Sequence, residues 1–215
     1  MLYLIDSGNY DEINDALAIG AQGVTANTSM YLKNEISLKE FINYYSKKKL
    51  NFLSAEVIGT YEEMLSQALE FHKMNNNIVI KINFSKDGLR LVKELKQQGI
   101  KTAMSLLFTI NQAVAAINAG CDYLFFFIGR NEENGSDGLC AIVKIQNIIN
   151  SHNYSSKVVA ASIKNLYQLE QLANLKIDYA AIPYNLYIKS LSHPLTDSGA
   201  KTFENDYYKN PKNFI

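Results

Sequence analysis

At residues 78–83 the chain reads Ile78-Val79-Ile80-Lys81-Ile82-Asn83, an apolar and β-branched run typical of a strand that is buried on both faces. Such strands belong to parallel sheets that are covered by helices. Lys81 interrupts the run, and it has two interpretations. It is either a strand-end lysine whose ammonium group reaches water, or a buried lysine whose neutral amine can attack a carbonyl and form a Schiff base.

Similar apolar runs alternate with longer amphipathic segments along the chain. Ser37 predicts a capping-box helix start, and Gly20, Gly99 and Gly120 predict helix ends just before strands. Eight βα units in 215 residues predict a (β/α)8 TIM barrel within the α/β class, with a doubly wound open sheet as the alternative. The predicted strands are Leu2–Ile5, Gly23–Ala26, Phe52–Val57, Ile78–Ile82, Lys101–Leu106, Tyr123–Ile128, Lys157–Ala161 and Tyr179–Ile182.

Composition narrows the class of protein. Lys+Arg and Asp+Glu each total 21, so the formal net charge is +0, which argues against nucleic acid or an anionic membrane as the main partner. The start Met1-Leu2-Tyr3-Leu4-Ile5 is interrupted by Asp6 and lacks a basic leader, so we expect neither a signal peptide nor a membrane span, and a cytoplasmic location. No Pro- or Ser-rich linker divides the chain, so we expect residues 1–215 to form one domain.

Two further patterns concern cofactors. Cys121 and Cys140 lack metal-ligand spacing, and we expect both to be reduced thiols. No Gly-x-Gly-x-x-Gly or Walker sequence follows the first predicted strand. The usual sequence support for a nucleotide or dinucleotide site is therefore missing.

Polar side chains gather where the predicted strands end, and a barrel carries its chemistry at that edge. Each has a structural interpretation, such as a helix N-cap for Asp6 or Asn27, but their common register favours a functional site. A lysine flanked by carboxylates and an amide suits Schiff-base chemistry, because carbinolamine formation and dehydration move protons beside the nitrogen. The residues are Asp6, Asn27, Glu56, Lys81, Ser105, Arg130, Ser162 and Lys164.

Seven motifs, in order along essentially the whole chain, resemble those of a known family. They are Leu4-Ile5-Asp6-Ser7, Gly23-Val24-Thr25-Ala26-Asn27-Thr28-Ser29, Ala55-Glu56-Val57, Ile78-Val79-Ile80-Lys81-Ile82, Met104-Ser105-Leu106-Leu107-Phe108-Thr109, Phe127-Ile128-Gly129-Arg130 and Ala161-Ser162-Ile163-Lys164-Asn165. Together they are similar to the transaldolases, especially the small subfamily that includes fructose-6-phosphate aldolase.

The resemblance implies a catalytic role for four residues. Lys81 would form the Schiff base with a ketose phosphate, and Asp6 would take the proton of the C4 hydroxyl as the C3–C4 bond breaks. Glu56 would move protons through a water, assisted by Ser105. The resemblance implies no metal and no organic cofactor, because the lysine supplies the electrophile.

The resemblance also implies how the substrate is held. Asn27 would bind donor hydroxyls, and the phosphate would lie between Arg130, Ser162 and Lys164. Phe127 stands near the catalytic water, where fructose-6-phosphate aldolase has a tyrosine. This difference favours a transaldolase of the pentose phosphate pathway, which transfers a dihydroxyacetone unit between sugar phosphates.

Two alternatives stay open: an aldolase that releases free dihydroxyacetone, and a non-catalytic barrel that binds a sugar phosphate. The sequence departs from the family pattern at Thr28 and Asn83, where prolines are expected, and at Ala26, where a threonine is expected. Phe125 replaces a small residue, which predicts a shortened or closed substrate site. The segment 196–209 resembles the extra C-terminal helix of small transaldolases, and implies a homo-oligomer of one or two five-membered rings.

Overall fold

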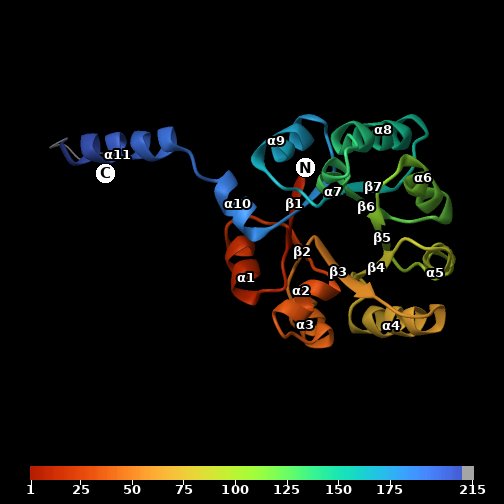
Figure 1. Cartoon of the computed structure of the whole chain (residues 1–215). Helices are drawn as coiled ribbons and strands as arrows, with labels where there is room; N and C mark the ends of the chain where they lie inside the picture. Colours follow the sequence, from red (N-terminus) through yellow and green to blue (C-terminus); the bar gives the residue numbers. More distant parts are fainter. Residues whose placement is uncertain (210–215) are drawn as a thin grey trace.

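The fold is a closed barrel of parallel strands that are paired in sequence order, with β8 returning to β1 (Figure 1). This computed structural model describes residues 1–209. The predicted TIM barrel is confirmed, and the open-sheet alternative is wrong because the last strand pairs with the first. The strands are β1 (Leu2–Asp6), β2 (Gly23–Thr25), β3 (Phe52–Val57), β4 (Val79–Asn83), β5 (Thr102–Leu107), β6 (Tyr123–Phe127), β7 (Lys157–Ala161) and β8 (Tyr179–Ile182).

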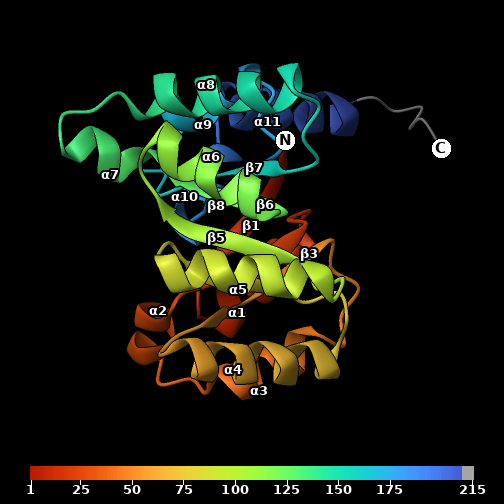
Figure 2. The ribbon, with the colours of Figure 1, turned by 90° about the vertical axis from the view of Figure 1, so that its right-hand side faces the viewer.

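Helices surround the barrel, and the last one projects away from it (Figures 1 and 2). The predicted extra C-terminal helix is present as α11. The helices are α1 (Tyr10–Ala18), α2 (Thr28–Lys33), α3 (Leu38–Tyr45), α4 (Tyr61–Met74), α5 (Lys86–Gln97), α6 (Ile110–Ala119), α7 (Ile128–Glu133), α8 (Gly138–Ser151), α9 (Leu166–Asn174), α10 (Tyr184–Ser190) and α11 (Pro194–Lys209).

Side-chain caps and a left-handed glycine mark the ends of several helices. Ser37 accepts a hydrogen bond from the Glu40 N–H and caps α3, as predicted. The reciprocal bond of a full capping box occurs at the starts of α4 and α6, where Thr60 and Thr109 are the N-caps. Gly120 ends α6 with a φ of 92°, a left-handed conformation that glycine adopts without steric cost.

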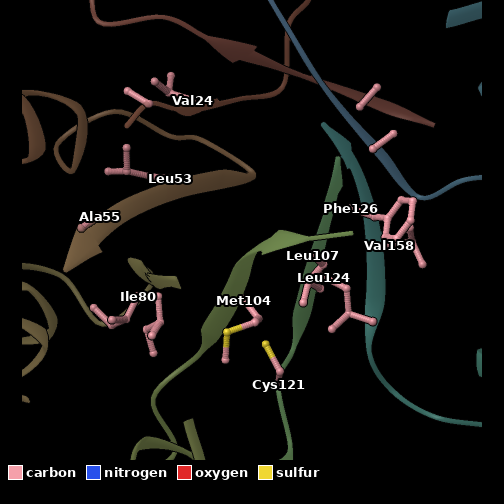
Figure 3. Packing of buried hydrophobic residues seen from close by; sticks show 14 of the residues in the cluster. Val24, Leu53, Ala55, Ile80, Met104, Leu107, Cys121, Leu124, Phe126 and Val158 are labelled. Atoms are coloured by element: carbon pink, nitrogen blue, oxygen red, sulfur yellow. The ribbon is translucent and has the colours of Figure 1, made fainter. Parts of the chain in front are cut away.

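The large hydrophobic core lies between the barrel and its helices. Side chains alternate along a strand, so every second residue points outward to the helices. Figure 3 shows part of this layer, in which Val24, Ile80, Met104, Leu124 and Phe126 are buried. The strands read as continuous apolar runs because their other face is also covered, by the barrel interior.

A smaller core fills the barrel interior. It includes Leu4, Phe52, Val79, Phe125 and Tyr179, and all five are buried. The Phe52 and Phe125 ring centroids lie 6.0 Å apart. These side chains close the lower part of the barrel, so a ligand can enter only above them, at the carboxyl ends of the strands.

Strand ends differ from the predicted ones by about one residue. β2 stops at Thr25 and β6 at Phe127, because Ile128 already begins α7. In β5 the register shifts between Met104 and Leu107, and Leu106 has a φ of 58°. In a separate finding, no helix within residues 1–209 is both long enough and apolar enough to cross a membrane.

Candidate active site

A cavity of about 620 Å³ lies at the carboxyl ends of the barrel strands. Its walls come from residues far apart in sequence, which the closed barrel brings together. Seven residues predicted from the sequence line it: Asp6, Asn27, Glu56, Lys81, Ser105, Phe127 and Arg130. Six of the eight polar residues expected at strand ends therefore line one cavity, together with Phe127.

The alternation of side chains explains why the polar residues meet. Lys81 follows Val79 by two positions and Ser105 follows Ala103 by two, and both apolar residues belong to the interior core. The polar side chains therefore form the layer directly above that core. Glu56 and Lys81 are register partners on β3 and β4, which sets their side chains side by side.

Lys81 is buried, with 4% of its surface exposed. Its Nζ donates a hydrogen bond to the Ala26 carbonyl at 2.7 Å and lies 3.7 Å from Glu56 Oε1. The Phe125 ring centroid is 5.6 Å from the same nitrogen. The interpretation of Lys81 as a strand-end lysine that reaches water is wrong. Its environment is more polar than the strand sequence predicts, because neighbouring strands supply the partners.

Glu56 is anchored through one of its two carboxylate oxygens. Oε2 accepts a hydrogen bond from the Thr28 backbone N–H at 2.8 Å and another from Thr28 Oγ1 at 2.7 Å. The other oxygen, Oε1, faces Lys81. Glu56 is itself buried, and a buried carboxylate needs partners of this kind to offset its lost hydration.

Asp6 lies at the end of β1 and lines the cavity. Burial raises the pKa of its carboxyl above the usual value, the positive charge of Lys81 partly lowers it, and the negative charge of Glu56 raises it further. Asn9, not Asp6, is the N-cap of α1, so the structural interpretation of Asp6 as a helix cap is wrong. A raised pKa makes the ionised carboxylate a stronger base than an ordinary aspartate.

Asn27 and Ser105 complete the polar wall. Asn27 is both a helix cap and a cavity residue: its Oδ1 accepts a hydrogen bond from the Met30 N–H at 3.2 Å, which leaves the amide nitrogen to donate to a ligand. Ser105 is buried on β5. Because Asn83 and Ser105 are register partners, both reach the cavity from neighbouring strands.

The three residues predicted to bind phosphate are only partly brought together. Arg130, in α7, lines the cavity, and its guanidinium carbon is 5.4 Å from the Phe127 ring centroid. Ser162 and Lys164 lie on the loop after β7 and are not among the cavity-lining residues. The Gly129 N–H donates to the Ser162 carbonyl at 3.1 Å, so this loop lies against α7.

Lys164, on the loop after β7, already forms an ion pair with an acidic residue of α7. Its Nζ lies 3.1 Å from Glu133 Oε1, and about half of each side chain is exposed. The spacing of residues in the sequence does not reveal this pair, because Glu133 reaches Lys164 only through the contact between α7 and the loop after β7. A phosphate held by Lys164 must displace or share that carboxylate.

Phe125 forms part of the cavity floor. Its ring is buried and packs with Phe52, and the cavity stays open above it. Of the two expected effects of the phenyl ring, closure of the site is therefore wrong, and a shortened site stays a prediction. The reason is that β6 aims the ring into the interior core, which has room for it because Ala103, Ala161 and Ala181 are small.

Sequence reasoning missed part of the cavity. In the sequence Thr28 stands out only as a residue in place of an expected proline, and its bonds to Glu56 depend on the pairing of β2 with β3. Lys33, from α2, is an additional cation among the lining residues. Among the residues that the structure describes, no cluster of His, Cys, Asp and Glu side chains could hold a metal ion.

Comparisons with known proteins all point to one family of enzymes. The family model described as Transaldolase/Fructose-6-phosphate aldolase matches residues 3–213. A protein named "Probable transaldolase" from Desulfitobacterium hafniense is 37% identical over 211 residues, which is 97% of this chain and 99% of the relative. Proteins of the same name are 36% identical in Thermoanaerobacter sp. (97% of this chain, 98% of the relative) and in Geotalea daltonii (99% and 100%).

Proposed function

This chain belongs to the transaldolase/fructose-6-phosphate aldolase family, and we propose that it is a Schiff-base transaldolase that transfers a dihydroxyacetone unit from a ketose phosphate to an aldose phosphate. One observation carries the proposal. Lys81 is a buried amine in the cavity with one carboxylate, Glu56, 3.7 Å away, and a second, Asp6, lines the same cavity. An amine between two proton-transfer groups suits imine chemistry.

The first step uses Lys81 and Glu56. The neutral amine adds to the C2 carbonyl of the donor and gives a carbinolamine. The C2–O bond then breaks, the oxygen leaves as water after gaining a proton, and the nitrogen lone pair completes the iminium. The position of Glu56 beside the nitrogen supports its role in relaying these protons, and Ser105 lies on the neighbouring strand to hold the water.

The second step uses Asp6. It takes the proton of the C4 hydroxyl, the C3–C4 electron pair moves into the iminium, and an aldehyde and an enamine result. The enamine carbon attacks the acceptor aldehyde, and Asp6 returns the proton to the new hydroxyl. The raised pKa of Asp6 supports a group that alternates between base and acid. Asn27 would bind the donor hydroxyls from the same side of the cavity.

The rim of the cavity supports phosphate recognition. Arg130 is the one member of the predicted phosphate site that lines the cavity, and its planar guanidinium group can donate two N–H bonds to a phosphate. We assign Ser162 and Lys164 to the outer edge of the same phosphate site, because the Gly129–Ser162 contact holds their loop against α7. The substrate class is therefore sugar phosphates.

Phe127 favours transfer over release. It lines the cavity and packs against Phe108 with the rings tilted at 59° and their centroids 5.5 Å apart. A phenyl ring has no hydroxyl to orient a water that would protonate the enamine. The enamine should then persist until an acceptor aldehyde arrives.

Borohydride trapping tests the covalent step. The wild-type chain, incubated with fructose 6-phosphate and reduced, should give an adduct on Lys81 by mass spectrometry. Lys81→Met should give none, while the control Lys86→Met, at an exposed helix start only five positions further on, should give the wild-type yield. An adduct on another lysine, or no adduct with any ketose phosphate, would contradict the proposal. The alternative of a non-catalytic barrel that binds a sugar phosphate would then be favoured.

A second assay separates transfer from cleavage. Fructose 6-phosphate is supplied with and without erythrose 4-phosphate, and sedoheptulose 7-phosphate and free dihydroxyacetone are measured. We expect transfer to exceed release, and Phe127→Tyr to raise release. Release as fast as transfer would instead identify a fructose-6-phosphate aldolase-like enzyme.

The exposed C-terminal helix supports an oligomer. No described residue of α11 is buried, and Leu195, Phe203 and Tyr208 are each at least 74% exposed. We propose that this apolar surface packs against a second copy of the chain, in a homo-oligomer of five or ten subunits, and that each copy works as one domain in the cytoplasm. Sedimentation of a monomer at working concentration would contradict the assembly.

A further inference from the structure

A short segment after β2 contacts both members of the Lys81–Glu56 pair. The Ala26 carbonyl accepts the hydrogen bond from Lys81 Nζ at 2.7 Å. Two residues later, Thr28 donates to Glu56 Oε2 through its N–H at 2.8 Å and its hydroxyl at 2.7 Å. Two residues of one short segment therefore fix the amine and the carboxylate of neighbouring strands relative to each other.

The two oxygens of Glu56 are not equivalent in this arrangement. Oε2 faces two donors, so it acts as an acceptor only. Oε1 lies 3.7 Å from Lys81 Nζ, which is too far for a direct hydrogen bond and leaves space for proton exchange beside the nitrogen. Oε2 is thus the anchored oxygen, and Oε1 is the oxygen available to the reaction.

We propose that Thr28 is a positioning residue that holds Glu56 Oε1 at the reacting nitrogen. The inference deepens the proposed Schiff-base function and rests on it. Two bonds to Oε2 from this position need a residue with both a backbone N–H and a side-chain donor, and Thr28 supplies both. Proline, which the family resemblance leads one to expect here, gives neither. This chain therefore orients its carboxylate with its own donors.

The step that Thr28 serves follows from the position of Oε1. Loss of water from the carbinolamine, and the reverse hydrolysis of the iminium, both need a proton moved beside the nitrogen. Cleavage of the C3–C4 bond uses Asp6 instead. Loss of the Thr28 bonds should slow imine formation and leave the KM for fructose 6-phosphate almost unchanged, because Thr28 holds Glu56 and not the phosphate.

A graded series of variants tests this inference. Thr28→Ser keeps both donors, Thr28→Val keeps only the N–H, and Thr28→Pro keeps neither. Proline is tolerated at the first residue of a helix, which is the place of Thr28 in α2. The readout is the rate of imine formation with fructose 6-phosphate, by rapid mixing followed by borohydride trapping and mass spectrometry.

We expect a loss of about 10-fold for each donor removed, the size expected for a hydrogen bond to a charged group. Thr28→Val should be about 10-fold slower and Thr28→Pro on the order of 100-fold slower, while Thr28→Ser restores the rate to within about 2-fold. A role limited to the fold predicts a different pattern: lower melting temperatures, with an unchanged rate per folded molecule.

The background Glu56→Ala decides whether Thr28 acts through Glu56. If it does, Thr28→Val causes no further loss of rate when the carboxylate is absent, so the two changes are not additive. A full additional loss in that background, or a flat Thr28 series in a chain that does form the Lys81 adduct, overturns the inference and leaves the proposed function standing. Absence of any adduct in the wild-type chain contradicts both.

Discussion

Asp6→Asn tests the electrostatics of the cavity. Asp6 is half-buried beside two charged groups, and burial raises its pKa more than the charge of Lys81 lowers it. Its ionised form therefore destabilises the folded state relative to a neutral side chain. Asparagine has nearly the same shape without the charge, so the variant removes this cost. Lys81 keeps Glu56 and the Ala26 carbonyl as partners.

The sign of the effect depends on pH. An aspartate in an unfolded chain titrates near pH 3.9, and that of the folded chain titrates higher. Below about pH 4 both states hold the proton and the carboxyl does not penalise folding. As the pH rises from the unfolded pKa to the folded pKa, the unfolded state ionises while the folded state still holds its proton, so the wild-type chain loses stability relative to Asp6→Asn.

The magnitude follows from the same linkage. Each pH unit between the two pKa values corresponds to about 1.4 kcal/mol, or roughly 3–6 °C in melting temperature for a chain of this length. The stability gain of Asp6→Asn should therefore be near zero at pH 4 and grow to a plateau above the folded pKa. Transfer activity should fall by about 10²- to 10⁴-fold, as expected for loss of a general base.

Thermal melting of both proteins between pH 4 and pH 8 measures the difference. The control is Asp11→Asn, which removes an exposed carboxylate from the first turn of α1. That carboxylate stabilises the helix when it is ionised, so its removal should give no gain at high pH. If Asp6→Asn is less stable than wild type at pH 7 and equal to it at pH 4, attraction to Lys81 outweighs burial and the reasoning is wrong.

Three further predictions concern the surroundings of the site. Phe125→Ala should lower stability by about 3–5 kcal/mol, or roughly 6–20 °C in melting temperature, because it removes a buried ring that packs in the barrel interior. Glu133→Gln should lower the KM for sugar phosphates by about 2-fold, because it frees Lys164 from a half-exposed ion pair, and an unchanged or higher KM would contradict the phosphate assignment. A maleimide should label exposed Cys140 and leave Cys121 unreacted in the folded chain, because burial raises the pKa of Cys121 to about 12; peptide mapping distinguishes the two.

The barrel could be predicted from sequence because its signal is local and repeated. Each strand is a short apolar run, and the regular alternation with helices leaves few topologies. The ends of the strands were less predictable, because they depend on neighbours. β6 stops at Phe127 only because Ile128 starts α7, and the register shift in β5 depends on its pairing with β6.

The catalytic layer was predictable for a related reason. A two-residue period places Lys81 above Val79 and Ser105 above Ala103, so a polar residue at the end of an apolar strand must point into the barrel. The rim was less predictable, because loops after strands follow no such period. Ser162 follows its strand more closely in sequence than Asn27 does, and Lys164 is only one position further from its strand than Asn27 is, yet both lie outside the cavity lining.

The hydrogen-bond partners within the layer could not be predicted at all from position in the sequence. Thr28 and Glu56 are 28 residues apart, and Ala26 and Lys81 are 55 apart. These contacts exist only because the segment after β2 reaches Glu56 on β3 and Lys81 on β4 in the closed barrel. The two-residue alternation along each strand thus determines which polar side chains enter the cavity. The closing of the barrel determines which other residues contact and orient them. A departure from a family pattern, such as Thr28 in place of proline, is therefore most informative where a segment from elsewhere in the barrel contacts a pair of catalytic side chains.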